Sequence, residues 1–202
     1  MSRLRIALWL LAGCAIAVVA FLAATIRVVE PSIATAQPSP APAPSPPRVA
    51  MAAASRLIVP VQGVRVETLR SNWGEARGGG TRAHEGLDIV APANTPVIAA
   101  ADGRVEKLFY SNGGGGITLY QRSADGGWMY YYAHLAGYAP GIAEGGVLRA
   151  GDVLGYVGDT GNSGAGNFHL HFGVNRMAAG ERWHQGTPVD PYPLLAGSRV
   201  ER

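Results

Sequence analysis

Hydrophobic residues follow two different patterns along this chain. Residues 6–26 form an uncharged and predominantly apolar run. As an α-helix that run would extend roughly 31 Å, close to the hydrocarbon thickness of a bilayer. From residue 95 onward, apolar positions instead occur in short segments separated by glycine-containing turns, which is typical of antiparallel β-strands. The pattern therefore predicts one membrane-length helix followed by an all-β domain.

Six short segments of the second half carry the strand pattern. Asp-Gly and Asn-Gly pairs lie between several of them, and these pairs favour the tight turns of β-hairpins. We expect one compact antiparallel β-sheet domain over residues 56–202, without a long amphipathic helix. The expected strands are residues 97–101, 105–110, 117–122, 128–134, 153–157 and 169–174.

Two glycine runs are interpreted as loops. Residues 113–116 are four consecutive glycines, and no Lys-Ser/Thr pair follows them, so they do not form a phosphate-binding loop. We interpret them as a mobile hairpin tip, because glycine permits turn conformations at low steric cost. Residues 78–80 have the same character and lie next to the candidate site, whose entrance they could shape.

The N-terminal segment is expected to export the domain. Arg3 and Arg5 precede the apolar run and only Arg27 follows it closely, so the positive-inside rule places the N-terminus in the cytoplasm. We interpret residues 1–30 as a signal anchor with its transmembrane helix at residues 6–26. The domain would then lie on the extracytoplasmic side of a bacterial inner membrane.

Two other N-terminal assignments stay open. Residues 34–36 resemble a cleavage site for a removable signal peptide. Residues 11–14 resemble a lipobox, which would place a lipid on Cys14. All three assignments export the domain. Residues 31–55 follow as a Pro- and Ala-rich linker, whose composition favours an extended spacer that holds the domain away from the membrane.

Charge and cysteine content narrow the function. The formal net charge is +3, but residues 56–202 contain thirteen Arg and Lys against thirteen Asp and Glu, so the positive excess belongs to the N-terminal segment. A neutral domain has no electrostatic footprint for nucleic acid. Because Cys14 is the single cysteine, the domain has neither a disulfide nor a thiolate metal site. Any metal there must be held by nitrogen and oxygen ligands.

Four of the five histidines occur in contexts that suggest a common surface. His84 and Asp88 are four residues apart, and even spacing on a strand places both side chains on one face. His169 and His171 are two residues apart, with the same consequence. His-x-His and His-x3-Asp are each common by chance, so their specificity comes from occurring together.

His134 is the fourth of these histidines. It ends the strand 128–134 and is expected to share a face with Tyr130 and Tyr132. Three distant segments can thus present imidazoles and a carboxylate to one surface. Zinc favours those donors, and a catalytic zinc site uses three protein ligands with water in the fourth position. Two imidazoles would remain beside that water to move protons and stabilise an oxyanion.

The order of these motifs resembles a known family. From about residue 73 to residue 172 the chain is similar to the lysostaphin/LytM zinc metallopeptidases, also called glycyl-glycine endopeptidases. The matching segments are, in order, His84-x-Gly86-x-Asp88, the segment 99–105, Tyr132-Ala133-His134-Leu135, the glycine-rich segment 151–164 and His169-Leu170-His171-Phe172.

The resemblance implies roles that spacing alone does not assign. It implies a compact antiparallel β-fold with the site in an open groove. It makes His84, Asp88 and His171 the ligands of one zinc ion per domain. It makes His169 the general base, and His134 its partner in activating water or stabilising the transition state.

Four further side chains lie outside this set of ligands and catalytic histidines. Arg82, Tyr130 and Tyr132 are candidate substrate contacts, although packing or solvation would also explain them. His184 is expected to be a surface loop residue, because three zinc ligands are already assigned.

The resemblance, together with export and the spacer, implies a zinc metalloendopeptidase that hydrolyses peptide cross-links of peptidoglycan in the bacterial cell envelope. Its partners would be peptidoglycan stem peptides or cross-bridges, the membrane, and a regulatory protein where one exists. The alternative is a catalytically idle relative that binds or activates other cell-wall hydrolases. The presence of all five site residues favours retained chemistry. The bond that is cut, whether in a glycine bridge or a D-alanyl-diaminopimelate cross-link, stays open.

Overall fold

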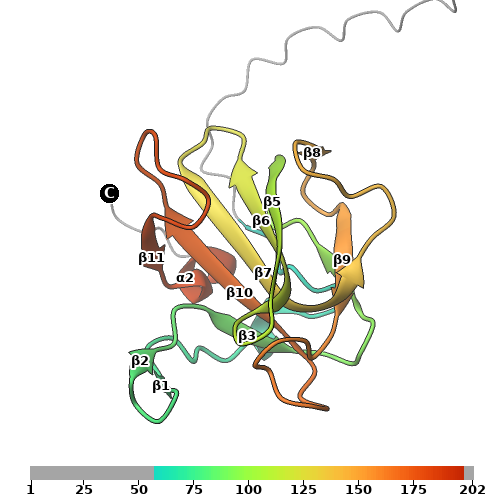
Figure 1. Cartoon of the computed structure of the whole chain (residues 1–202). Coiled ribbons are helices and arrows are strands. Elements are labelled where there is room, and N and C mark those ends of the chain that lie inside the picture. Colours follow the sequence, from blue (N-terminus) through green and yellow to red (C-terminus); the bar gives the residue numbers. More distant parts are fainter. Residues whose placement is uncertain (1–56, 198–202) are drawn as a thin grey trace, which may run out of the picture. The chain divides into compact units, whose positions relative to one another are not determined.

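The computed structural model describes residues 57–197. These residues fold around an antiparallel β-sheet, which confirms the all-β prediction (Figure 1). Their helical content is the 3-10 helix η1 (Val66–Thr68) and the helix α2 (Pro191–Ala196). Within residues 57–197 no helix is long and apolar enough to cross a membrane. The predicted anchor at residues 6–26 and the linker at 31–55 lie outside the described residues.

Within this part of the chain, nine strands form one sheet and two form a separate ribbon, β1–β2. The central path of the sheet is β11-β10-β7-β6-β5-β8; β3 pairs with β10, and β9 joins β7 to β4. The strands are β1 (Ala76–Arg77), β2 (Arg82–Ala83), β3 (Leu87–Val90), β4 (Pro96–Ile98), β5 (Gly103–Ser111), β6 (Gly116–Ser123), β7 (Trp128–Tyr138), β8 (Val147–Leu148), β9 (Val153–Val157), β10 (His169–Arg176) and β11 (Thr187–Val189).

All six predicted strands are present, and two of them differ from their predicted bounds by more than two residues at one end. The strand expected at 97–101 ends at Ile98, because the backbone beyond it pairs elsewhere: Ala99 N–H donates to the Asp152 carbonyl at 2.9 Å, and Ala100 N–H donates to the Tyr132 hydroxyl at 2.9 Å. The strand expected at 128–134 continues to Tyr138, past His134. The short strands β1, β2, β3, β8 and β11 were not predicted.

One face of the sheet carries the hydrophobic core. On β10, the side chains of Leu170, Phe172 and Val174 are fully buried, and they alternate with the side chains of the opposite face. Leu119 on β6 and Leu154 on β9 are equally buried. Burial of each such side chain contributes about 2 kcal/mol. The period of two along β10 therefore leaves His169 and His171 together on the face opposite the core.

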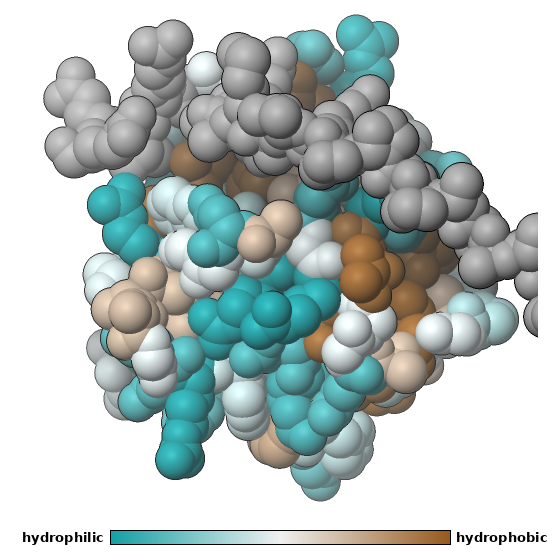
Figure 2. Space-filling model, turned by 90° about the horizontal axis from the view of Figure 1, so that it is seen from above, coloured by the Kyte–Doolittle hydropathy of each residue, from teal (hydrophilic) through white to brown (hydrophobic). Residues whose placement is uncertain are grey.

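Two segments that flank the candidate site lie at the same end of the sheet. Figure 1 shows the β1–β2 ribbon and the loop that joins β9 to β10 at this same end. On the face seen in Figure 2, hydrophilic side chains occupy the centre and hydrophobic ones lie beside them, so this face is not one continuous apolar patch. The candidate site lies between the ribbon, the β9–β10 loop and the sheet.

Candidate metal centre and active-site groove

Two neighbouring strands bring the first pair of candidate ligands together. In the antiparallel pairing of β3 with β10, Asp88 lies directly opposite His171, and His171 Nδ1 is 3.0 Å from Asp88 Oδ1. His84 Nε2 lies 3.0 Å from the same Oδ1 and 2.9 Å from His171 Nδ1. These three atoms, from residues up to 87 positions apart, form a closed triangle.

The prediction that His84 and Asp88 lie on one strand was wrong. The two residues do not share one strand face, because residues 84–86 form a bend between β2 and β3. The two side chains nevertheless meet, with His84 Nε2 3.0 Å from Asp88 Oδ1, because the chain bends at Gly86 between the two residues.

The triangle fits a divalent metal ion. The carbonyl of Asn72 is 2.9 Å from His84 Nδ1, which places the proton on Nδ1 and leaves a lone pair on Nε2. Two imidazole nitrogens and a carboxylate oxygen therefore converge within 4.8 Å of one another. Their separations are close to the roughly 3.3 Å between ligands of a tetrahedral zinc at 2.0–2.2 Å. The lone pairs of these three atoms point toward one another and would repel. A bound cation, or protons shared between the atoms, removes that repulsion.

Asn72 and Arg77 support the triangle, and the sequence analysis missed both. The Asn72 amide donates to Asp88 Oδ2 at 3.0 Å and accepts from the Asp88 backbone N–H at 3.2 Å. Arg77 Nη2 is 2.7 Å from Asp88 Oδ2. These contacts leave Oδ1 facing the imidazoles. No motif could reveal them, because they depend on a loop and a ribbon folding back over β3.

The site's titratable groups are held in defined charge states. Burial by itself would raise the pKa of Asp88, but the hydrogen bond with His171 and the neighbouring imidazoles hold that pKa well below its usual range. Burial lowers the pKa of His84. Burial also lowers the pKa of His134, to about 4. At neutral pH the carboxylate is therefore ionised, while the rings of His84 and His134 are neutral.

Gly86 permits the close approach of His171. A Cβ atom at Gly86 would lie 2.5 Å from His171 Cε1, 2.6 Å from its Nε2 and 3.0 Å from the Phe172 carbonyl oxygen. The imidazole thus rests directly on the Gly86 backbone. A side chain at this position would move the ring that supplies one corner of the triangle.

A β-bulge aims His134 at the groove. Between Tyr132 and Leu135, β7 has one residue more than the facing segment of β6. His134 has a φ of 61°, a left-handed conformation that costs about 1–3 kcal/mol in a residue other than glycine. Its backbone N–H donates to the Gly115 carbonyl at 2.7 Å. The bulge lets Tyr132 and Leu135 both stay fully buried while His134 turns to the opposite side.

The second catalytic candidate, His169, lies beside His134. The two ring centroids are 4.9 Å apart. His169 Nδ1 is 2.9 Å from the Asn167 carbonyl, and His134 Nδ1 is 2.8 Å from the Thr160 carbonyl. Each carbonyl fixes the proton on Nδ1, so both rings present an Nε2 lone pair. His169 Nε2 points toward the triangle and lies 3.7 Å from Asp88 Oδ1.

The glycine run 113–116 forms a hairpin turn, as expected, and this turn also packs against the β9–β10 loop. The Gly114 carbonyl accepts a hydrogen bond from the Asn162 backbone N–H at 2.8 Å. A Cβ at Gly116 would overlap the backbone at residues 160–161. Glycine therefore allows this turn to pack against the β9–β10 loop, and Gly114 forms part of the groove wall.

Two of the three candidate substrate contacts lie in the hydrophobic core and not in the groove. Tyr130 is 4% exposed and Tyr132 is 0% exposed, and both pack on Phe172 in the core. The Tyr132 hydroxyl donates to Gln121 Oε1 at 2.6 Å. Because the bulge after Tyr132 changes the alternation, His134 does not share their face. Tyr131 is the tyrosine that lines the groove instead.

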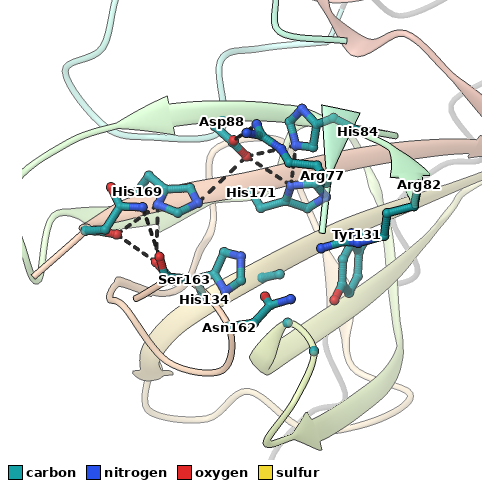
Figure 3. Close-up of a pocket in the computed structure, with 14 residues that line it drawn as sticks. Arg77, Arg82, His84, Asp88, Tyr131, His134, Asn162, Ser163, His169 and His171 are labelled. Carbon is teal, nitrogen blue, oxygen red and sulfur yellow. Dashed lines mark hydrogen bonds and ion pairs between the residues drawn. The ribbon is translucent and has the colours of Figure 1, made fainter. Parts of the chain in front are cut away.

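These residues surround one cavity of about 250 Å³. Figure 3 shows the ligand triangle between two ends, with His134, Ser163 and His169 at one end and Tyr131 and Arg82 at the other. Arg82, a candidate substrate contact, lines the groove, whereas His184 is exposed and is not among the lining residues. The lining comprises Arg77, Arg82, His84, Asp88, Gly114, Gly115, Tyr131, Ala133, His134, Asn162, Ser163, Asn167, His169 and His171.

An antiparallel sheet whose groove holds two imidazoles and a carboxylate, with two free imidazoles beside them, has the donor arrangement of a mononuclear metallohydrolase. Comparison with known proteins agrees with this class. Residues 82–191, more than half of the chain, match Peptidase family M23. The chain belongs to that family.

Individual relatives extend the comparison. The L-Ala--D-Glu endopeptidase of Bacillus subtilis is 40% identical over 142 residues, which are 65% of this chain and 41% of that protein. The DD-carboxypeptidase/endopeptidase Mpg of Neisseria meningitidis is 36% identical over 129 residues, 64% of this chain and 25% of that protein. This chain therefore matches less than half the length of either relative.

A solved structure shows the same fold. The catalytic domain of lysostaphin from Staphylococcus simulans superposes with a TM-score of 0.52 at 29% identity, covering 65% of this chain and 95% of that domain. The antiparallel lysostaphin-like fold implied by the sequence motifs is therefore confirmed.

Proposed function

We propose that this protein is a zinc metalloendopeptidase that hydrolyses peptide bonds in the peptidoglycan of a bacterial cell envelope. The observation that carries the proposal is the triangle of His84 Nε2, Asp88 Oδ1 and His171 Nδ1, with separations of 2.9–3.0 Å. Membership of family M23 supports peptidase chemistry. The names of the relatives support the substrate, since they include an L-Ala--D-Glu endopeptidase.

The proposed chemistry divides between the metal and two histidines. Zinc bound by His84, Asp88 and His171 would supply a water of lowered pKa and polarise the scissile carbonyl. His169 would accept the proton of the attacking water on Nε2 and then donate it to the leaving amine. The Asn167 carbonyl, which accepts from His169 Nδ1, would stabilise the imidazolium between those two transfers.

His134 would assist in a different way. Burial keeps its pKa at about 4, and its Nδ1 proton is held by the Thr160 carbonyl. At neutral pH its Nε2 is an acceptor, so we propose that it orients the attacking water rather than acting as the primary acid.

Metal removal tests the proposed function. Full-length protein stripped with a chelator is expected to release no muropeptides from purified peptidoglycan, and one equivalent of zinc per chain is expected to restore release. Chromatography and mass spectrometry of the digest would identify the bond. If the zinc-loaded protein binds peptidoglycan without cutting it, the non-enzymatic alternative replaces this proposal.

Replacing Gly86 with alanine tests the packing under the metal site. The new methyl group would displace His171, and we expect zinc affinity to fall by about 10- to 100-fold. Competition with a chromophoric zinc chelator measures this change. Gly137→Ala is the matched control, because a Cβ there meets nothing within 4 Å. Equal zinc affinity in both variants would contradict the role given to Gly86.

We also propose that the N-terminal segment tethers the domain to the inner membrane. The proposal rests on the apolar run at residues 6–26 and the linker at 31–55. The mass of the mature N-terminus distinguishes an intact anchor from signal cleavage near residues 34–36 and from a lipid on Cys14.

A further inference from the structure

The groove carries an arginine whose charge has no partner among the described residues. Arg82 is exposed and lines the same cavity as the ligand triangle. Its guanidinium makes no hydrogen bond or ion pair within residues 57–197, whereas Arg77 contacts both Asp88 and Glu75. Arg82 is thus a free cation beside the candidate reaction centre.

The position of Arg82 has an energetic cost. In the β1–β2 ribbon, Arg82 lies directly opposite Arg77, and like charges on directly opposed residues destabilise a strand pair. The charge of Arg77 is compensated by Asp88 Oδ2 at 2.7 Å. Within residues 57–197 nothing compensates the charge of Arg82, and each strand of its ribbon has two residues.

The described residues that line the groove offer Arg82 no free carboxylate. Asp88 is the one acidic residue among its lining residues, and its two oxygens already face Arg77, Asn72 and the imidazoles. Any metal ion in the triangle would add positive charge. The end of the groove that holds Arg82 and Tyr131 is therefore complementary to an anionic group (Figure 3).

We propose that Arg82 binds a substrate carboxylate next to the scissile bond, so that the groove selects acidic stem peptides over neutral glycine bridges. This inference rests on the proposed function, because a peptide must occupy the groove. A planar carboxylate can accept two parallel hydrogen bonds from a guanidinium, which gives direction as well as affinity. The carboxylate would lie on the side of the scissile bond away from His169.

A binding experiment tests the inference without requiring turnover. Two probes are used: a stem tetrapeptide with free side-chain carboxylates, and the same peptide with those carboxylates amidated. In full-length, zinc-loaded His169→Ala protein, the free-carboxylate peptide is expected to bind about tenfold more tightly or better. In the double variant that adds Arg82→Gln, the ratio of the two affinities is expected to fall to about one, with the amidated peptide unaffected.

Two further variants sharpen the test. Arg82→Lys keeps the charge but loses the planar fork, so it is expected to retain only part of the preference. Arg149→Gln removes an exposed arginine that is not among the groove residues and is expected to leave the ratio unchanged. Raising the ionic strength is expected to reduce the ratio of the two peptide affinities in protein that contains Arg82, and to leave it unchanged in the Arg82→Gln variant.

Three outcomes would overturn the inference: equal affinity of both peptides when Arg82 is present, an unchanged ratio in Arg82→Gln, or equal weakening of both peptides by that change. The hydrolysis assay is separate. If protein with His169 intact releases no muropeptides from purified peptidoglycan while the affinity ratio depends on Arg82, the inference stands and the proposed peptidase function fails.

Discussion

Replacing His171 with alanine is expected to remove bound zinc and to lower the rate of peptidoglycan hydrolysis by about 1,000-fold or more. His171 Nδ1 closes the ligand triangle, at 2.9 Å from His84 Nε2 and 3.0 Å from Asp88 Oδ1. Without it, one imidazole and one carboxylate remain, which is too few for a stable mononuclear zinc site. Metal analysis after dialysis and muropeptide release measure the two effects.

The control for this change is His184→Ala. His184 is exposed and is not among the groove residues, so its removal is expected to change neither zinc content nor rate. His171→Ala protein that keeps full activity would show that the metal assignment is wrong. Protein that keeps zinc but loses activity would instead move His171 from ligand to catalytic residue.

Replacing His169 with alanine is expected to leave zinc bound while lowering kcat by about 100- to 10,000-fold. His169 is not a corner of the triangle, since its Nε2 lies 3.7 Å from Asp88 Oδ1. It lines the groove, and the Asn167 carbonyl at 2.9 Å from its Nδ1 orients the ring so that Nε2 faces the triangle. Its loss therefore removes proton transfer and leaves metal binding intact.

Ser163→Ala is the matched comparison for His169. The Ser163 hydroxyl lies 3.3 Å from His169 Nδ1, farther than the Asn167 carbonyl, so its removal is expected to change kcat by less than about tenfold. Zinc content, kcat and KM measured for both variants separate the two roles. Zinc lost together with activity in His169→Ala would contradict the division between ligands and base.

The fold class and the shared face of His169 and His171 were predictable because their signals are local. A strand shows its period of two in its own residues, and a hairpin shows its turn in a pair such as Asp125-Gly126, between β6 and β7. His169 and His171 therefore had to share a face once β10 formed. The convergence of His84 with Asp88 followed from the motif order of the family, although the bend at residues 84–86 was not expected.

The misplaced tyrosines show the limit of local patterns. Simple alternation along residues 128–134 puts His134 beside Tyr130 and Tyr132. The bulge between Tyr132 and Leu135 adds one residue and reverses the side on which His134 emerges. A bulge depends on the pairing of β7 with β6 and β9, and that pairing has no signature within β7 itself.

The sequence by itself determined the all-β class, the motif order of an M23 peptidase and the five donors His84, Asp88, His134, His169 and His171. The all-β class follows from strand period, which belongs to single segments of chain, whereas the five site residues follow from the motif order that the chain shares with the family. The tertiary structure alone decided the support of Asp88 by Asn72 and Arg77, the position of Tyr131 in the groove wall, and the position of Arg82 opposite Arg77. Those features are contacts between segments distant in sequence, and such contacts exist only after the ribbon, the loops and the sheet have come together.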